Sequence, residues 1–263
     1  MTQEIYMRLI EEISLNAWPS YKTELYDGWL IRFSHNYTHR TNSVEQVGIS
    51  QLPVEEKISY CESIYAGYRT PVHFKINPLM DPSFDKRLEK RGYVIQHTTE
   101  VMTMAMTNFC EYHPDTIQDK PIVQFQNQIT DHWIHAVFCL NGTTDLTLRR
   151  IVPSMFKAIP KETIAAFIED GGRIVALGLG ILDRGHIGLY AIYVEAGYRH
   201  RNYARSICNA ILEEARKRGA VNAYLQVVQG NAAAKELYKS LGFTDFYTYW
   251  FRTLECVGLY QPL

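Results

Sequence analysis

The sequence has no long apolar run, no excess of charge of one sign and few cysteines. No stretch approaches the roughly 20 apolar residues that a membrane-spanning helix needs. The 263 residues carry 27 basic and 28 acidic side chains, a net charge of −1, so bulk charge gives no reason to expect nucleic acid or an anionic membrane as a partner. The beginning, Met1 to Tyr6, lacks the basic and apolar regions of a signal peptide.

The cysteines and histidines do not form a recognisable framework. The five cysteines are odd in number, scattered and without Cys-x-x-Cys spacing, which predicts reduced thiols and a cytoplasmic protein. They are Cys61, Cys110, Cys139, Cys208 and Cys256. His132 and His135 are three residues apart in an expected helix, but no acidic or cysteine partner at suitable spacing completes a site. We therefore expect no metal. No phosphate-binding Walker loop or hydrolase nucleophile elbow occurs either.

What the chain does contain is a strand, a turn and an amphipathic helix in the second half. The strand 187–194 runs into Arg199-His200-Arg201-Asn202-Tyr203-Ala204, where a helix opens. Apolar or small residues then recur with helical spacing, and Gly219 ends the helix. They are Ala204, Ile207, Cys208, Ile211, Leu212 and Ala215. The free N–H groups and the dipole of such a helix start favour a phosphate or diphosphate.

These residues resemble a known family. The run 199–204 resembles the Arg/Gln-x-x-Gly-x-Gly/Ala turn of the GCN5-related N-acetyltransferases (GNAT). The segment from Asn231 through Leu237-Tyr238 to Gly242-Phe243 resembles that family's Asn-x-x-Ala-x-x-Leu-Tyr-x-x-x-Gly-Phe. The two motifs stand in the family's order, with one strand, 223–229, between them. The resemblance covers about residues 122–254, and in this half we also expect a first strand at 121–126 and a last pair of strands near 244–254. It departs at Asn202, where the family has glycine; Asn is the next residue most tolerant of positive φ.

The resemblance implies a fold and a cofactor site. The fold is the α+β or α/β GNAT fold, a mixed, mostly antiparallel sheet with flanking helices. Acetyl-CoA is the implied acyl donor. Its diphosphate would lie at the turn and its pantetheine along the preceding strand. The implied cofactor-binding residues are Ile192, Tyr193, Val194, Arg199, His200, Arg201, Asn202, Tyr203, Ala204, Arg205 and Asn231.

Acetyl transfer to an amine also needs proton transfer. Tyr238 is the expected general acid, because a phenol is neutral at pH 7 and its position matches the family's tyrosine. Its helix should turn Ala234, Leu237, Tyr238 and Leu241 inward. The general base stays open, since the strand 187–194 contains no Glu. The alternatives are Glu195, His186, Asp183, Glu169 or a water molecule.

The first half echoes this plan weakly. A helix at 55–68, a strand at 72–76 and Gly92-Tyr93 before a β-like run at 99–106 predict a degenerate GNAT-like domain at 1–112, followed by a catalytic domain at 121–263. The polar segment 111–120 is the expected linker. The residues Ala17-Trp18-Pro19, Asp27-Gly28-Trp29-Leu30 and Arg40-Thr41-Asn42-Ser43 resemble openings of tandem GNAT-like proteins with an inactive N-terminal half.

The sequence thus predicts an acetyl-CoA-dependent N-acetyltransferase that acts on a primary amine of a small molecule or peptide. The alternative is a CoA-binding or sensing module without turnover, which the missing strand Glu and Asn202 favour. A third alternative is a structural protein that keeps the fold without the cofactor. The acceptor is not identified, and a homodimer is left open.

Overall fold

The computed structural model describes residues 1–109 and 121–254. The chain forms two compact units. Unit 1 comprises Met1–Ala17 and Glu100–Phe246, and unit 2 comprises Trp18–Thr99 and Tyr247–Leu263, which the structure describes as far as Leu254. The strands β5 (Val94–Ala105) and β11 (Thr244–Leu254) contribute residues to both units. The segment 111–120, expected as a linker, lies outside the described residues.

Unit 2 is a small sheet with two helices. Its elements are β1 (Lys22–Tyr26), β2 (Trp29–Phe33), η1 (His39–Thr41), β3 (Val44–Gln46), α2 (Val54–Gly67), β4 (Val72–Ile76) and α3 (Pro82–Lys90). The strand order is β1-β2-β3-β4-β11. Trp29, Phe74 and Phe84 pack edge to face in the core, with ring centroids 5.5–5.7 Å apart. The helix at 55–68 and the strand at 72–76 agree with the sequence prediction.

The motif residues of the N-terminal half have structural roles in unit 2. Asp27 and Gly28 form the β1–β2 turn with positive φ, and a Cβ on Gly28 would come within 2.5 Å of the Ile49 carbonyl oxygen. The buried Lys57 ammonium lies 3.1 Å from the Asp27 carboxylate and over the Trp29 ring. The motif therefore fixes a tight hairpin.

The second motif closes the loop around η1. The Asn42 side-chain oxygen accepts hydrogen bonds from the backbone N–H groups of Ser34 and Asn36, at 2.9 and 3.1 Å. Arg40 Nε donates to the Tyr249 hydroxyl at 2.8 Å. Local side-chain bonds of this kind hold irregular backbone in one conformation.

Unit 1 contains the turn and the helices singled out in the sequence. Its elements are α1 (Gln3–Ala17), η2 (Met106–Asn108), β6 (Gln124–Gln126), α4 (Asp131–Asn141), α5 (Leu146–Lys157), β7 (Glu162–Asp170), β8 (Arg173–Asp183), β9 (His186–Val194), η3 (Ala196–Tyr198), α6 (Tyr203–Lys217), β10 (Asn222–Val228) and α7 (Ala232–Ser240). The strand order is β5-β10-β9-β8-β7-β6, with β6 to β9 antiparallel and β9–β10 parallel.

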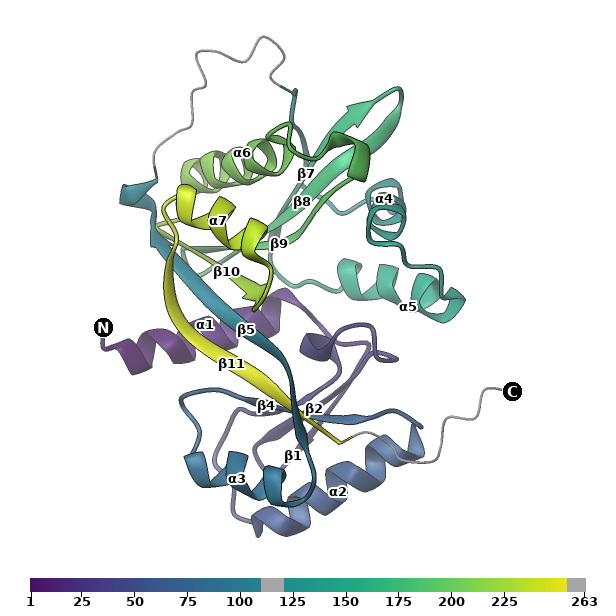
Figure 1. The fold of residues 1–263 in the computed structure, drawn as a ribbon, viewed down its shortest axis with the longest axis vertical. Coiled ribbons are helices and arrows are strands. Elements are labelled where there is room, and N and C mark those ends of the chain that lie inside the picture. Colours follow the sequence, from purple (N-terminus) through teal and green to yellow (C-terminus); the bar gives the residue numbers. More distant parts are fainter. Residues whose placement is uncertain (110–120, 255–263) are drawn as a thin grey trace. The chain divides into compact units, whose positions relative to one another are not determined.

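The helices α6 and α7 lie side by side on the same core (Figure 1). Ile207, Ile211 and Leu212 of α6 are fully buried in it. Two glycines of β8 allow α6 to approach the sheet, since a Cβ on Gly178 or Gly180 would come within 2.5 Å of an isoleucine of α6. The helix stripe predicted from periodicity is therefore the buried face.

Two sequence predictions of strands need correction. The pair of strands expected near 244–254 is the single strand β11, because no glycine, proline or asparagine interrupts that run of β-forming residues. The strand expected at 121–126 is only Gln124–Gln126. The division into compact units also differs from the expected boundaries, because α1 belongs to unit 1 and the end of β11 belongs to unit 2. That both units derive from one GNAT-like ancestor stays a prediction. No helix within residues 1–109 and 121–254 is long and apolar enough to cross a bilayer.

Candidate functional site

The strands β9 and β10 part half-way along their length. Their parallel register runs from Asn222 opposite His186 to Leu225 opposite Leu189. However, β9 continues to Val194 and β10 to Val228. Beyond Leu189 the edge of β9 that faces β10 therefore has no partner strand in this register. Unpaired strand edges offer N–H and C=O groups to an extended ligand. We call this opening the fork.

A β-bulge in β9 lies at the fork. Leu177 pairs with Tyr193 and Leu179 with Tyr190, so two residues of β9 oppose Gly178. One of them, Ala191, has φ of 48°. A non-glycine residue in the left-handed region is strained, and bulges of this kind often lie beside functional sites. The bulge changes the direction of the backbone N–H and C=O groups of Ile192–Val194, the segment that the sequence predicts to bind pantetheine.

The turn between β9 and α6 has alternating backbone hand. Arg199 has φ of −67°, His200 has φ of 61° and Asn202 has φ of 60°, while Arg201 between them does not have positive φ. Such alternation directs successive N–H groups into one concavity that suits an anion. Asn202 adopts the left-handed conformation that the family's glycine would take, as its side-chain chemistry predicted.

The start of α6 differs from the starts of α4, α5 and α7. The side chains of Thr130, Asp145 and Asn231 cap α4, α5 and α7 by accepting hydrogen bonds from backbone N–H groups. Asn202, the N-cap of α6, makes no such bond. The first N–H groups of α6 therefore have no capping side chain and can serve an external acceptor.

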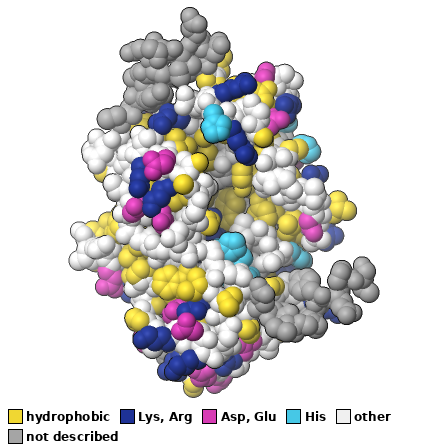
Figure 2. Space-filling view, viewed as in Figure 1, with side chains coloured by type: hydrophobic (Ala, Val, Ile, Leu, Met, Phe, Trp, Pro, Cys, Tyr) yellow, Lys and Arg dark blue, Asp and Glu magenta, His cyan; other side chains and the backbone are white. Residues whose placement is uncertain are grey.

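Basic side chains surround this turn. Arg199, His200 and Arg201 are exposed, and Arg205 is half-buried. Arg199 Nε donates to the Val194 carbonyl at 3.3 Å, and Arg201 lies over the Tyr198 ring. Within the described chain neither arginine is paired with a carboxylate. On the face drawn in Figure 2, acidic and basic side chains are interspersed without an extended patch of one sign.

The β7–β8 hairpin braces the turn. The Tyr198 hydroxyl donates to the Asp170 carboxylate, and Arg173 Nη1 lies 2.7 Å from Glu195 Oε2. The hydrogen bond to Asp170 is the main cause that raises the pKa of Tyr198. Because each end of η3 is attached to the hairpin, the backbone that leads into the turn is positioned before any ligand arrives.

Tyr238 lies on the inward face of α7. Ala234, Leu237 and Tyr238 are half-buried against the core of unit 1, and Leu241 is buried. The Tyr238 and Phe243 rings meet edge to face with centroids 6.3 Å apart. The predicted inward face is thus confirmed. The Asn231 side chain caps this helix by accepting from the Ala234 N–H at 3.2 Å.

The candidate bases all have structural partners. Asp183 is buried, accepts a hydrogen bond from Asn16 at 3.0 Å and pairs with Lys161 at 3.1 Å. His186 Nδ1 bonds the Arg184 carbonyl oxygen at 2.8 Å. Glu195 pairs with Arg173, and Glu169 lies 3.6 Å from His132. Among the described residues, no contact that we see joins any of these groups to the fork. The general base therefore remains one of these side chains or a water molecule.

His132 and His135 point to different partners. His132 contacts Glu169, whereas His135 Nε2 lies 3.5 Å from the Cys139 sulfur. Among residues 1–109 and 121–254, no three His, Cys, Asp or Glu side chains are grouped so that they could hold a metal ion.

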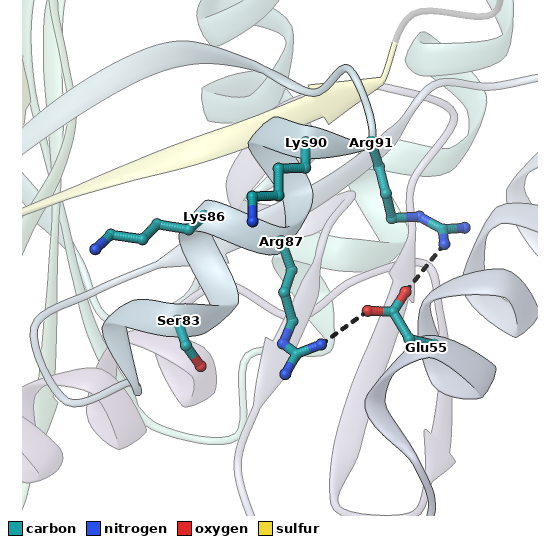
Figure 3. Close-up of a pocket in the computed structure, with 6 residues that line it drawn as sticks. All are labelled: Glu55, Ser83, Lys86, Arg87, Lys90 and Arg91. Atoms are coloured by element: carbon teal, nitrogen blue, oxygen red, sulfur yellow. Dashed lines mark hydrogen bonds and ion pairs between the residues drawn. The ribbon is translucent and has the colours of Figure 1, made fainter.

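A separate pocket of about 380 Å³ lies between α2 and α3 in unit 2. It is lined by Glu55, Ser83, Lys86, Arg87, Lys90 and Arg91. Arg87 and Arg91 point toward Glu55, each with an N···O distance of 3.1 Å, while Lys86 and Lys90 point away (Figure 3). Exposed pairs of this kind stabilise little and are common on helix surfaces. We assign no function to this pocket.

Comparison with known proteins identifies the family. A family model described as "Probable histone acetyltransferase Rv0428c C-terminal" matches residues 2–251. The chain belongs to this family. Its fold is the GNAT fold: a "GCN5-related N-acetyltransferase" from Kribbella flavida superposes with a TM-score of 0.68 at 12% identity, covering 94% of each chain. The chain is thus a member of the GNAT superfamily, as the two motifs implied.

Two curated proteins are similar in sequence. "Uncharacterized N-acetyltransferase YobR" of Bacillus subtilis (strain 168) is 25% identical over 253 residues, which cover 94% of this chain and 98% of that protein. "[Ribosomal protein bS18]-alanine N-acetyltransferase" of Escherichia coli (strain K12) is 30% identical over 78 residues, 30% of this chain and 53% of that protein. The first similarity extends over both units, so unit 2 is part of the shared architecture.

Sequence reasoning missed two features of the site. The bulge at Ala191 has no local signal, because alanine normally avoids positive φ and the bulge is set by pairing with β8. The hydroxyl pair formed by Tyr190 and Tyr224 was also missed. Gly188 was its one available signal, since glycine inside a strand often marks a close approach of other atoms.

Proposed function

We propose that this GNAT protein transfers an acetyl group directly from acetyl-CoA to a primary amine. The observation that carries the proposal is the combination of the uncapped start of α6 with the alternating backbone hand of His200–Asn202. Together they provide several N–H donors and a positive dipole for the cofactor's diphosphate. The exposed Arg199 and Arg201 add charge of the right sign. The remaining contact residues would be Tyr203, Ala204 and Arg205.

The fork supplies a place for the rest of the donor. The edge of β9 at Ile192–Val194 has no β10 partner in register and can bond the amides of pantetheine. This contact is independent of side-chain identity. The start of α7, with Asn231, closes the cofactor site in this proposal.

The chemistry requires a proton for the leaving thiolate. We assign this role to Tyr238, whose half-buried phenol lies on the inward face of α7. The acceptor nitrogen attacks the thioester carbonyl, the C–S bond breaks, and the phenol proton passes to the sulfur. The amine proton leaves to a base that is one of the open candidates or water, and the phenolate is reprotonated from solvent.

The acceptor is a small-molecule or peptide amine in this proposal. Support for amine chemistry comes from the relatives, whose names specify N-acetyltransferase activity. The name of the E. coli relative specifies an alanine of a ribosomal protein, which makes a peptide α-amine a sensible first probe.

The test is acceptor-dependent release of CoA from acetyl-CoA with a panel of amines. The panel should include alanine-initiated peptides, tyramine, spermidine and glucosamine. Mass spectrometry of the product should show that the amine has become about 42 Da heavier, because an acetyl group replaces one hydrogen. CoA binding without acceptor-dependent release across the panel would favour the alternative of a non-catalytic CoA-binding module.

A further inference from the structure

Tyr190 and Tyr224 form a hydroxyl pair directly beside the fork. Their oxygen atoms are 2.7 Å apart, and their rings are almost perpendicular with centroids 6.1 Å apart. Tyr190 belongs to β9 and is the first residue beyond the last β9–β10 pair, Leu189 opposite Leu225. The pair therefore lies at the point where the two strands separate.

The pair faces away from α6. Ile187 and Leu189 of β9 and Leu225 of β10 belong to the core beneath α6. Because strand side chains alternate, Tyr190 and Tyr224 project to the opposite face. The face under α6 and α7 is filled by that core, whereas Tyr190 on the opposite face is only half-buried. The opposite face is therefore the one on which we place an acceptor that reaches a thioester in the fork.

The sequence makes specific room for this pair. A Cβ on Gly188 would come within 2.5 Å of Tyr190 Cε2 and within 2.7 Å of the Tyr224 hydroxyl oxygen. Such distances are far below van der Waals contact. Both tyrosine rings therefore occupy the space that a side chain at position 188 would need, and glycine leaves that space free.

A hydrogen-bond network fixes the two tyrosine hydroxyl groups. The Tyr224 side chain is 1% exposed, and its burial raises the pKa of the phenol well above its usual value, so it stays protonated. Ser14 of α1 is a further hydrogen-bond partner of Tyr224 and accepts from Gln226 Nε2 at 2.9 Å. The two residues that follow the last β9–β10 pair on this face, Tyr190 and Gln226, are therefore tied to one buried network.

We propose that Tyr190 positions the acceptor at the fork, and that Tyr224 and Ser14 fix Tyr190 in the orientation this requires. This inference rests on the proposed function. The side chains of Tyr190, Tyr224, Ser14 and Gln226 present neutral hydroxyl and carboxamide groups. This surface suits an acceptor that presents an uncharged amine with an adjacent polar group. Fixing a nucleophile near a carbonyl is a large part of catalysis in such reactions, because small displacements are costly.

A bisubstrate probe tests the inference without knowledge of the natural acceptor. The probe is CoA that carries an N-(2-hydroxyethyl)acetamide arm on its sulfur, whose hydroxyl supplies the polar group next to the nitrogen, and the comparison is CoA itself. Calorimetry should give the wild type about three- to tenfold higher affinity for the probe than for CoA, the size of one or two net hydrogen bonds. Tyr224→Phe should remove this gain and leave CoA affinity unchanged, and Ser14→Ala should remove part of it.

The matched control is Tyr65→Phe. Tyr65 is equally buried, and its hydroxyl donates to the Arg32 carbonyl at 2.7 Å in unit 2, so the change also deletes one buried phenol bond. The control should keep the full gain. The inference is overturned if the arm adds no affinity in the wild type, or if Tyr224→Phe keeps the gain, or if Tyr65→Phe loses it as well. Failure of the proposed function is distinct, since it would appear either as no binding of CoA itself or as no acceptor-dependent release of CoA across the amine panel.

Discussion

Gly178 of β8 lies directly beneath Ile207 of α6, and a Cβ on Gly178 would come within 2.5 Å of the Ile207 side chain. The same added carbon would come within 2.6 Å of Ile192, one of the two residues that form the bulge in β9. A single glycine thus sets the approach of α6 to the sheet and the space around the bulge. A side chain at position 178 would therefore displace both α6 and the bulge beside the fork.

Gly178→Ala should lower both stability and CoA affinity. Overpacking of a filled core destabilises by about 1–3 kcal/mol. Any shift of α6 also displaces its N-terminal N–H groups from the diphosphate. Urea denaturation and CoA titration measure the two effects. The matched control is Gly197→Ala, because no atom lies within 4 Å of the added carbon, and its stability should stay within about 0.5 kcal/mol of the wild type. Equal behaviour of the two variants would contradict this account of Gly178.

Tyr238→Phe tests the general acid. The substitution removes the hydroxyl and keeps the half-buried ring against the core, so folding and CoA affinity should change little. If the phenol protonates the departing thiolate, kcat should fall by about 10²–10⁴-fold. Single-turnover rates with an acceptor from the amine panel provide the measurement. A variant with nearly normal kcat would reduce Tyr238 to a packing residue and leave protonation to water.

The stability of the protein should fall as the pH is lowered from 6.5 toward 4. Burial lowers the pKa of His39 to about 4 and that of His73 to about 3, and the two rings lie 3.9 Å apart. Electrostatic interaction with His97 and Arg40 lowers the pKa of His39 further. Since the folded-state pKa values lie below the unfolded value, the unfolded chain binds more protons in this window, and protonation favours unfolding.

His39→Gln should make that pH dependence shallower. Urea midpoints between pH 4 and 7.5 provide the measurement, with His132→Gln as a control at a histidine that is mostly exposed. The control should keep the wild-type slope. A slope that is unchanged in His39→Gln would mean that other groups cause the acid sensitivity.

The sequence predicted those parts of unit 1 that local rules determine. The stripe of α6 follows helical periodicity, the end at Gly219 follows its positive φ, and the left-handed Asn202 follows its side-chain tolerance. The inward position of Tyr238 on α7 was likewise readable from spacing.

The rest depends on pairing between distant residues. The bulge at Ala191 arises from register with β8, and the fork arises where β10 stops pairing after Leu225. Neither has a local sequence signature. The helix α1 was not predicted, and its Ser14 contacts Gln226, more than 200 positions away in the chain. Unit boundaries that combine the two ends of the chain with its middle are similarly invisible to a reading along the sequence.

The number of CoA sites bears on the role of unit 2. Among its described residues, the start of α3 is capped by Asp81, whose carboxylate accepts from the Ser83 N–H at 2.8 Å. A carboxylate at that position satisfies an N–H group and repels a phosphate. The start of α2 has no capping side chain, but Glu55 and Glu56 in its first turn likewise repel a phosphate. We therefore predict that unit 2 binds no CoA and that the chain binds one CoA. Two equivalent sites in a titration would contradict the prediction of a degenerate N-terminal half.

Titration of CoA into the wild type and Ala204→Trp tests the central claim most directly. Ala204 lies in the first turn of α6, where a small side chain permits close approach of a diphosphate to the backbone. Circular dichroism and a thermal melt establish that the variant is folded. The account predicts one site per chain in the wild type and a loss of affinity of at least about tenfold in Ala204→Trp. Unchanged CoA affinity in a folded Ala204→Trp protein would contradict the assignment of this turn.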